Sequence, residues 1–259
     1  MMEHNLVWWL TLSLLALCAG SFFNLVIYRL PLMLLHPQMK LSLTSPRSHC
    51  PQCNTTLTLR DLIPLLSWLA LRGRCRHCYA RISWRYPALE LLSLLYALLV
   101  AAIFQSNWQI GLPALLFGWT LLILTFIDID HHLLPDVLTL SLLWAGLLRA
   151  ALIGQGPSPA GAIVATVAGY LLFRLLADIW YYWRHEVALG GGDIKLFAAL
   201  GAWLGLKALP ATLMIASAGA LIFLLIKSSV CRQPPPRRFA FGPWLALGGV
   251  MIFVWQNCH

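Results

Sequence analysis

Long stretches of apolar sequence without a formal charge limit what this chain can fold into. The longest covers 37 residues, from 91 to 127. As one helix it would extend about 55 Å, well beyond the apolar thickness of a bilayer. We therefore expect two membrane-spanning helices there, separated near residues 105–107 and Pro113. With 60% hydrophobic and only 10% charged residues, the composition argues against a soluble globular domain.

The remaining apolar runs predict an all-α, polytopic integral membrane protein with about eight transmembrane helices. The first run lacks a basic segment before it and a small-residue cleavage site after it, so we expect a retained helix. Arg149, near the far end of one span, is expected to extend to the membrane interface. Only eleven uncharged residues separate Lys195 from Lys207, and if this short helix does not cross, the count falls to seven. The other expected spans are residues 5–28, a run after Asp136, 160–183, 208–226 and 239–255.

The distribution of basic residues indicates which side of the membrane the loops occupy. A net charge of +9 is compatible with a nucleic-acid partner, but membrane proteins retain Lys and Arg on cytoplasmic loops, so we expect membrane lipid and no nucleic acid. Nine of the 18 Lys and Arg lie within residues 29–85, and four lie within 227–238. Two spans separate Cys78 from Asp128 and two more separate Asp128 from Asp193. These three regions are therefore expected on one side, the cytoplasmic side.

Two C-x-x-C pairs, with 21 residues between them, lie in the basic loop: Cys50 and Cys53, then Cys75 and Cys78. Two residues between thiols allow both sulfurs to face one tetrahedral ion, so the spacing predicts a structural zinc site. Neighbouring arginines, Arg74 and Arg76, are expected to favour the thiolate form. A redox dithiol and free thiols are the alternatives, whereas disulfides are disfavoured in the reducing cytosol.

Other potential ligands and thiols are expected to have minor roles. His49 and His77 adjoin the cysteines but are not needed as ligands when four sulfurs are available. Cys18, Cys231 and Cys258 have no partner at a suitable spacing and are interpreted as packing residues.

Four of the nine acidic residues fall at expected helix ends on the cytoplasmic side: Asp128, Asp130, Asp136 and Asp193. An ionisable residue beside the bilayer is a candidate functional residue. If two such carboxyl groups approach closely, they cannot both ionise freely, so one retains a proton while the other is charged. The charged group can take a proton from water while the protonated group polarises a peptide carbonyl, as in an aspartic protease. Glycines at 190–192 would allow a substrate backbone to lie close to Asp193.

Each aspartate also has a structural interpretation. Asp136 precedes an apolar run, so it is predicted to be a helix N-cap rather than a catalytic residue. Asp193 begins a glycine-rich helix and is a second candidate cap. Asp130 lies two residues from Asp128, so on a helix the two side chains would point in different directions.

These motifs, in this order, resemble the type IV prepilin leader peptidases, bifunctional membrane enzymes of pilus assembly and type II secretion. The resemblance implies cleavage of the basic leader of a prepilin or pseudopilin precursor at the cytoplasmic face of the bacterial inner membrane. It also implies methylation of the new amino terminus, usually phenylalanine, by S-adenosylmethionine. The family's essential pair matches Asp128 and Asp193, and Asp130 is not part of its pattern. The resemblance rests on residues 20–31, the cysteine pairs with 63–69, 85–90, 127–140, 190–195 and 241–244.

We accordingly expect three parts in the chain. Residues 1–30 form the first transmembrane helix, residues 31–87 a cytoplasmic loop with the zinc site and a methyltransferase part, and residues 88–259 a multi-helix aspartic peptidase domain. A proton-coupled transporter would place acids at the bilayer midplane near broken helices. A non-enzymatic membrane adaptor would use the cysteine loop to dock a partner. Neither alternative explains aspartates gathered at one membrane face.

Overall fold

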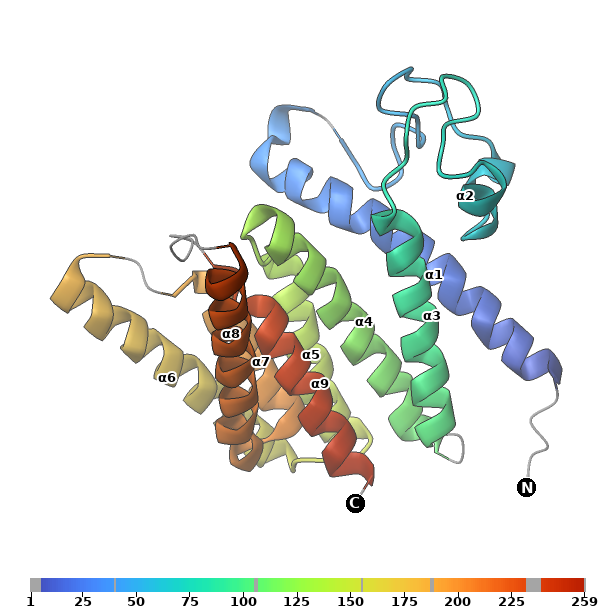
Figure 1. The fold of residues 1–259 in the computed structure, drawn as a ribbon. Coiled ribbons are helices and arrows are strands. Elements are labelled where there is room, and N and C mark those ends of the chain that lie inside the picture. Colours follow the sequence, from blue (N-terminus) through green and yellow to red (C-terminus); the bar gives the residue numbers. More distant parts are fainter. Residues whose placement is uncertain are drawn as a thin grey trace. The chain divides into compact units, whose positions relative to one another are not determined.

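The computed structural model describes residues 6–39, 41–104, 107–154, 156–186, 189–231 and 239–258. These residues form helices and loops but no strand, apart from isolated bridges between His49 and Thr56 and between Arg74 and Arg81 (Figure 1). The all-α prediction is confirmed. The expected break at 105–106, most of the basic loop at 232–238 and the Cys231 side chain lie outside the described residues. The chain divides into two compact units, Met1–Ser106 and Asn107–His259.

The first unit packs two long helices against each other, α1 (Leu6–Leu35) and α3 (Arg85–Phe104). Gly20 allows their close approach, since a Cβ there would lie 2.8 Å from the Glu90 Cα atom. At the same crossing, the Ser93 hydroxyl donates a 2.9 Å hydrogen bond to the Ala16 carbonyl. The loop between these helices contains three short helices, η1 (Pro37–Met39), η2 (Leu59–Leu62) and α2 (Leu66–Ala70).

Two buried charged side chains attach this loop to the helices. The Arg29 guanidinium on α1 donates hydrogen bonds to backbone carbonyls of the loop, including that of Ser42 at 2.8 Å and that of Pro46 at 2.6 Å. On α3, the Glu90 carboxylate accepts a 2.8 Å hydrogen bond from the Leu65 backbone N–H. The loop is therefore fixed to both helices by hydrogen bonds that involve buried charge.

The second unit is a bundle built around the short helix α7 (Gly191–Leu204), which contacts α5, α6 and α9. Residues Ile194 and Leu196–Leu204 are all buried. Small residues permit the contact with α6, because a Cβ on Gly201 would lie 2.6 Å from the Ala165 carbonyl oxygen. The helices around α7 are α4 (Trp108–His131), α5 (Asp136–Leu152), α6 (Pro159–Arg184), η3 (Leu206–Ala208), α8 (Leu209–Cys231) and α9 (Gly242–Cys258).

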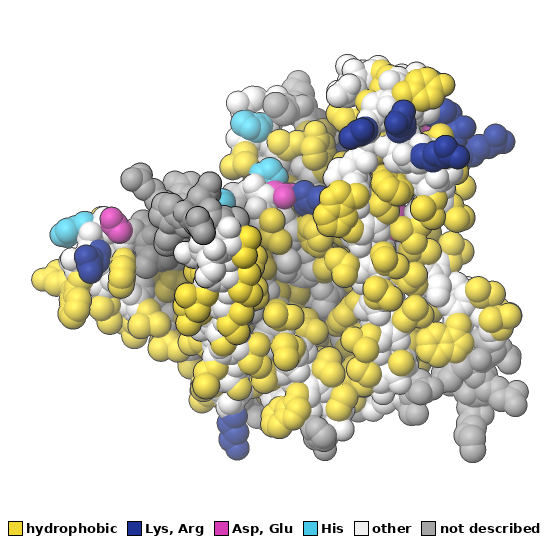
Figure 2. Space-filling view, viewed as in Figure 1, with side chains coloured by type: hydrophobic (Ala, Val, Ile, Leu, Met, Phe, Trp, Pro, Cys, Tyr) yellow, Lys and Arg dark blue, Asp and Glu magenta, His cyan; other side chains and the backbone are white. Residues whose placement is uncertain are grey.

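Helices form at all eight predicted spans, and five helical segments are long and apolar enough to cross a membrane: Leu6–Leu35, Arg85–Phe104, Trp108–His131, Pro159–Arg184 and Leu206–Val230. Helices α5, α7 and α9 are shorter, at 17, 14 and 17 residues. Eight crossings therefore stay a prediction. Hydrophobic side chains cover the outer surfaces of the helices in Figure 2, whereas Lys and Arg gather over the cysteine loop. Arg149 is only 5% exposed and its guanidinium lies beside Gly156 in the loop after α5, so its extension to the membrane interface stays a prediction.

Candidate functional site

Asp128 occupies the last turn of α4, where its side chain is buried and only 6% of the residue is exposed. The helix ends one turn later, because His132 adopts a left-handed conformation and its N–H donates to the Asp128 carbonyl. The Asp128 carboxylate is directed at the start of α9, where Oδ2 accepts a 2.9 Å hydrogen bond from the Gly242 backbone N–H. A Cβ on Gly242 would lie 2.7 Å from this oxygen, so glycine permits the contact.

Asp193 occupies the first turn of α7, whose N-cap is Gly190. Asp193 is not itself the N-cap, but its carboxylate accepts a hydrogen bond from the Gly190 backbone N–H, a contact typical of an acid that caps a helix start. Its Oδ1 atom is buried and has no hydrogen-bond partner. A carboxylate oxygen without a donor is costly in an apolar environment, and such a group calls for a functional explanation.

Leu134, in the connection between α4 and α5, packs against both helix starts. A Cβ on Gly192 would lie 2.6 Å from Leu134 Cβ, and a Cβ on Gly242 would lie 3.3 Å from Leu134 Cδ2. Asp128 and Asp193 are close enough for their carboxyl groups to interact electrostatically. The structure thus brings these two predicted residues together at one end of α4, α7 and α9.

The other two aspartates have different surroundings. Asp130 is exposed although Asp128 is buried, which confirms that the two side chains point in different directions. Asp136 was expected to be an N-cap, and this prediction is wrong. The N-cap of α5 is Pro135, and the Asp136 carboxylate instead pairs with Lys195, whose Nζ lies 2.6 Å from Oδ1 and 2.7 Å from Oδ2. No role was predicted for Lys195 or Gly242 from the sequence, although they lie in the motifs at 190–195 and 241–244.

The four predicted cysteines converge, with their Sγ atoms all within 4.8 Å of one another. The two C-x-x-C pairs adopt the same turn. Cys50 N–H donates to Thr55 O and Cys75 N–H donates to Ala80 O, at 3.0 and 2.8 Å. In each turn the residue after the second cysteine, Asn54 or Tyr79, has a positive φ.

The donor set fits zinc. In a tetrahedron with Zn–S bonds of about 2.3 Å, neighbouring sulfurs are about 3.8 Å apart, and Cys50 Sγ lies 3.8 Å from Cys78 Sγ. Hydrogen bonds with Thr55 lower the pKa of the Cys53 thiol to about 6, whereas desolvation and the neighbouring thiols raise the pKa of Cys78 to about 11, so the thiols titrate together as one cluster. His49 does not join the cluster, since its Nδ1 lies 3.1 Å from the Arg47 carbonyl oxygen.

Asp61 connects the two halves of the cysteine loop. Its Oδ2 atom accepts hydrogen bonds from the Thr58 hydroxyl and N–H, and its Oδ1 atom pairs with Arg76 Nε at 2.9 Å. These contacts, with the Thr58 hydroxyl first, hold the pKa of Asp61 at about 2. Arg76, which we expected to act on the thiols, thus pairs with a carboxylate.

The fold and these two clusters define a class of protein: a helical membrane protein with a paired-carboxyl cluster at its helix ends and a four-thiol site in a loop. The chain belongs to the type IV leader peptidase family, whose model matches residues 115–225. A second family model, the bacterial Peptidase A24 N-terminal domain, matches residues 14–104.

Curated relatives match over nearly the whole chain. A protein from Aeromonas hydrophila is 42% identical, over 99% of this chain and 94% of its own length. A second, from Dickeya chrysanthemi, is 45% identical over 96% of this chain and 93% of its own length. A third, from Neisseria gonorrhoeae, is 38% identical over 93% of this chain and 88% of its own length. All three are named prepilin leader peptidase/N-methyltransferase. No solved structure matches the chain.

Proposed function

We propose that this protein removes the basic leader peptide from prepilin or pseudopilin precursors by means of an aspartate pair, Asp128 and Asp193. Family membership and the names of the relatives support the substrate class. The observation that carries the mechanism is the convergence of the buried Asp128 and the half-buried Asp193 at one end of the helices, inside the segment that matches the peptidase family. The cleavage site is placed at the cytoplasmic face of the bacterial inner membrane, in agreement with the basic loops.

The two carboxyl groups have different hydrogen-bond environments, which suggests which one acts as the base and which as the acid. The Gly242 N–H donates to Asp128 and stabilises its carboxylate form, so Asp128 accepts a proton from the attacking water. Asp193 retains a proton and directs it at the carbonyl oxygen of the scissile peptide. Proton return to the departing amine completes hydrolysis. The glycines before Asp193 leave room for the substrate backbone, since a Cβ on Gly191 would meet nothing within 4 Å.

The N-terminal part is assigned to the second activity. We place a methyltransferase part and a structural zinc ion in residues 31–87, between the first transmembrane helix in 1–30 and the peptidase domain in 88–259. The names of the relatives include N-methyltransferase, and S-adenosylmethionine would supply the methyl group. Zinc held by Cys50, Cys53, Cys75 and Cys78 would contribute folding energy to the loop.

Mass spectrometry of a co-expressed pilin-like precursor tests this function, because one spectrum reports both leader removal and methylation. Asp128→Asn and Asp193→Asn are nearly isosteric, and each should lower the rate of leader removal by about 10³-fold or more, as loss of an essential acid or base does. Asp130→Asn, an exposed neighbour, is the matched control and should process normally. Normal processing by either of the first two variants would refute the pair.

A further inference from the structure

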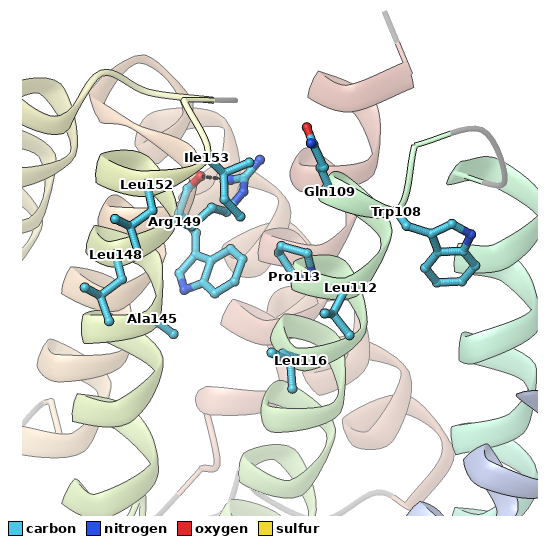
Figure 3. A pocket seen from close by; sticks show the side chains of 11 residues that line it. Trp108, Gln109, Leu112, Pro113, Leu116, Ala145, Leu148, Arg149, Leu152 and Ile153 are labelled. Carbon is cyan, nitrogen blue, oxygen red and sulfur yellow. Dashed lines mark hydrogen bonds between the residues drawn. The ribbon is translucent and has the colours of Figure 1, made fainter.

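A pocket of about 430 Å³ lies between α4 and α5, at the opposite end of these helices from the aspartates (Figure 3). Gln109 lines it in the first turn of α4, whereas Asp128 lies in the last turn. At about 1.5 Å per residue the two positions are separated by about 28 Å along the helix. The pocket is thus distinct from the candidate peptidase site.

The lining residues divide the pocket into a polar end and an apolar end. Gln109 and Arg149 line it near the helix termini. Leu112, Leu116 and Leu148 line it further along α4 and α5, where Leu112 is 58% exposed and Leu116 53% exposed. In Figure 3, the Leu112 and Leu116 side chains follow one another down α4 from the polar end. A ligand that fills this space must itself be amphipathic.

Arg149 brings a buried positive charge to the polar end. Its guanidinium lies over the rings of Trp203 and Phe253, 5.5 and 5.0 Å from their centroids. Nη1 donates to the Trp203 carbonyl at 3.3 Å and Nη2 to Asn257 Oδ1 at 3.5 Å, both long contacts to neutral oxygens. The Nε atom is buried without a hydrogen-bond partner.

No carboxylate among the described residues pairs with Arg149. The acidic residues of this unit lie in the last turn of α4, in the C-terminal third of α6 or just beyond it, or in the first turns of α5 and α7, toward the other end of the helices: Asp128, Asp130, Asp136, Asp178, Glu186 and Asp193. A cation held in an apolar bundle without an anion is unfavourable. Within the described part of this unit, no negative group offsets the charge of Arg149, and its Nε atom is free to bind one.

We propose that this pocket binds a phospholipid from the membrane leaflet opposite the aspartates. The lipid phosphate contacts the Arg149 guanidinium, which suits planar, charge-assisted recognition of phosphate oxygens. One acyl chain lies along Leu112, Leu116 and Leu148. Because no described carboxylate lies beside Arg149 to hold an ammonium group, a lipid of net negative charge is preferred over a zwitterionic one.

Native mass spectrometry of the full chain in detergent tests the charge preference. The lipid-bound fraction of the protein should be about fivefold or more higher with phosphatidylglycerol than with phosphatidylethanolamine. This ratio corresponds to a difference of about 1 kcal/mol in binding free energy. Arg149→Met should remove this preference. The matched control is Arg184→Met, at the last turn of α6, where the guanidinium likewise lies over a tryptophan ring but is exposed. Equal retention of the two lipids by the wild type, or an unchanged preference in Arg149→Met, would overturn the proposal.

A second variant keeps the test valid if Arg149→Met folds poorly. Leu112→Trp blocks the apolar end without touching the arginine, and Leu171→Trp, an exposed position on α6, is its control. Phosphatidylglycerol should raise the Tm of the wild type and of Leu171→Trp but not that of Leu112→Trp. A similar rise in Tm with inorganic phosphate alone would show a simple anion site and contradict phospholipid binding. Leader cleavage by Arg149→Met in the same detergent should be unchanged, which separates this proposal from that of the peptidase.

Discussion

The cysteine cluster and the aspartate cluster are built in opposite ways. Each half of the cysteine cluster is formed by one short turn, in which hydrogen bonds join residues five positions apart, such as Cys50 and Thr55. The aspartate cluster instead combines the end of α4 and the starts of α7 and α9, with Leu134 between the two helix starts. A local turn can place a metal ligand by itself, whereas the carboxyl pair depends on how the whole bundle packs. The two clusters should therefore respond differently to substitution.

The largest expected effect is loss of the metal. The wild-type protein should carry about one zinc per chain, and the paired substitution Cys50→Ser/Cys53→Ser should carry none, because two of four thiolates are gone. Methylation of the precursor should be lost, while the rate of leader removal stays within about threefold of the wild-type rate. This corresponds to a change of less than about 0.7 kcal/mol in the activation barrier. Metal analysis and mass spectrometry of the precursor measure both. Loss of cleavage as well would show that the two clusters depend on each other.

Glycine substitutions test the packing of the aspartate cluster. Gly242→Ala would place a Cβ 2.7 Å from Asp128 Oδ2, and Gly192→Ala one 2.6 Å from Leu134 Cβ. Displacement of a reacting group by about 1 Å can cost about 10²-fold in rate, so cleavage should fall by about 10- to 100-fold in each variant.

Gly191→Ala is the control for these two variants, since its Cβ would meet nothing within 4 Å. It should cleave the precursor within about twofold of wild type, about 0.4 kcal/mol in the barrier. Zinc content should be unchanged in all three. If all three glycine variants cleave equally well, the close packing around the carboxyl groups has no role in the reaction.

The smallest effect concerns Asp61 in the cysteine loop. Because the pKa of its carboxyl is lowered to about 2 in the folded protein, its contribution to stability is fully present above about pH 4 and is lost as the pH falls through about 2. Asp61→Asn should destabilise the loop at pH 7 by about 1 kcal/mol, after allowance for solvent screening. Hydrogen exchange of the loop amides measures the difference between the wild type and the variant. That difference should shrink between pH 4 and pH 2, and a constant difference would contradict the assigned ionisation.

Sequence patterns predicted the structure well wherever the residues of one segment determine it. The spacing of Cys50, Cys53, Cys75 and Cys78 predicted their convergence, and apolar length predicted the helices. The pattern around Asp136 was misleading, because a cap is a local expectation and the carboxylate is instead held by Lys195 from another helix. The burial of Arg149 was not predicted for the same reason. Its position near a helix end predicts only that it reaches the interface, whereas its burial depends on Trp203 and Phe253 from other helices, whose rings lie against the guanidinium.

By itself, the sequence determined that this chain is helical, that helices occupy eight apolar segments, and which side chains are able to bind metal or exchange protons. These properties follow from the hydrophobicity of single segments and from the spacing of ligands along one loop. Only the tertiary structure decided that Asp136 pairs with Lys195, that Asp128 accepts a hydrogen bond from Gly242, and that an arginine lies buried beside an amphipathic pocket. Such outcomes depend on contacts between helices, where a missing Cβ on Gly242 or Gly192 decides how closely two segments approach.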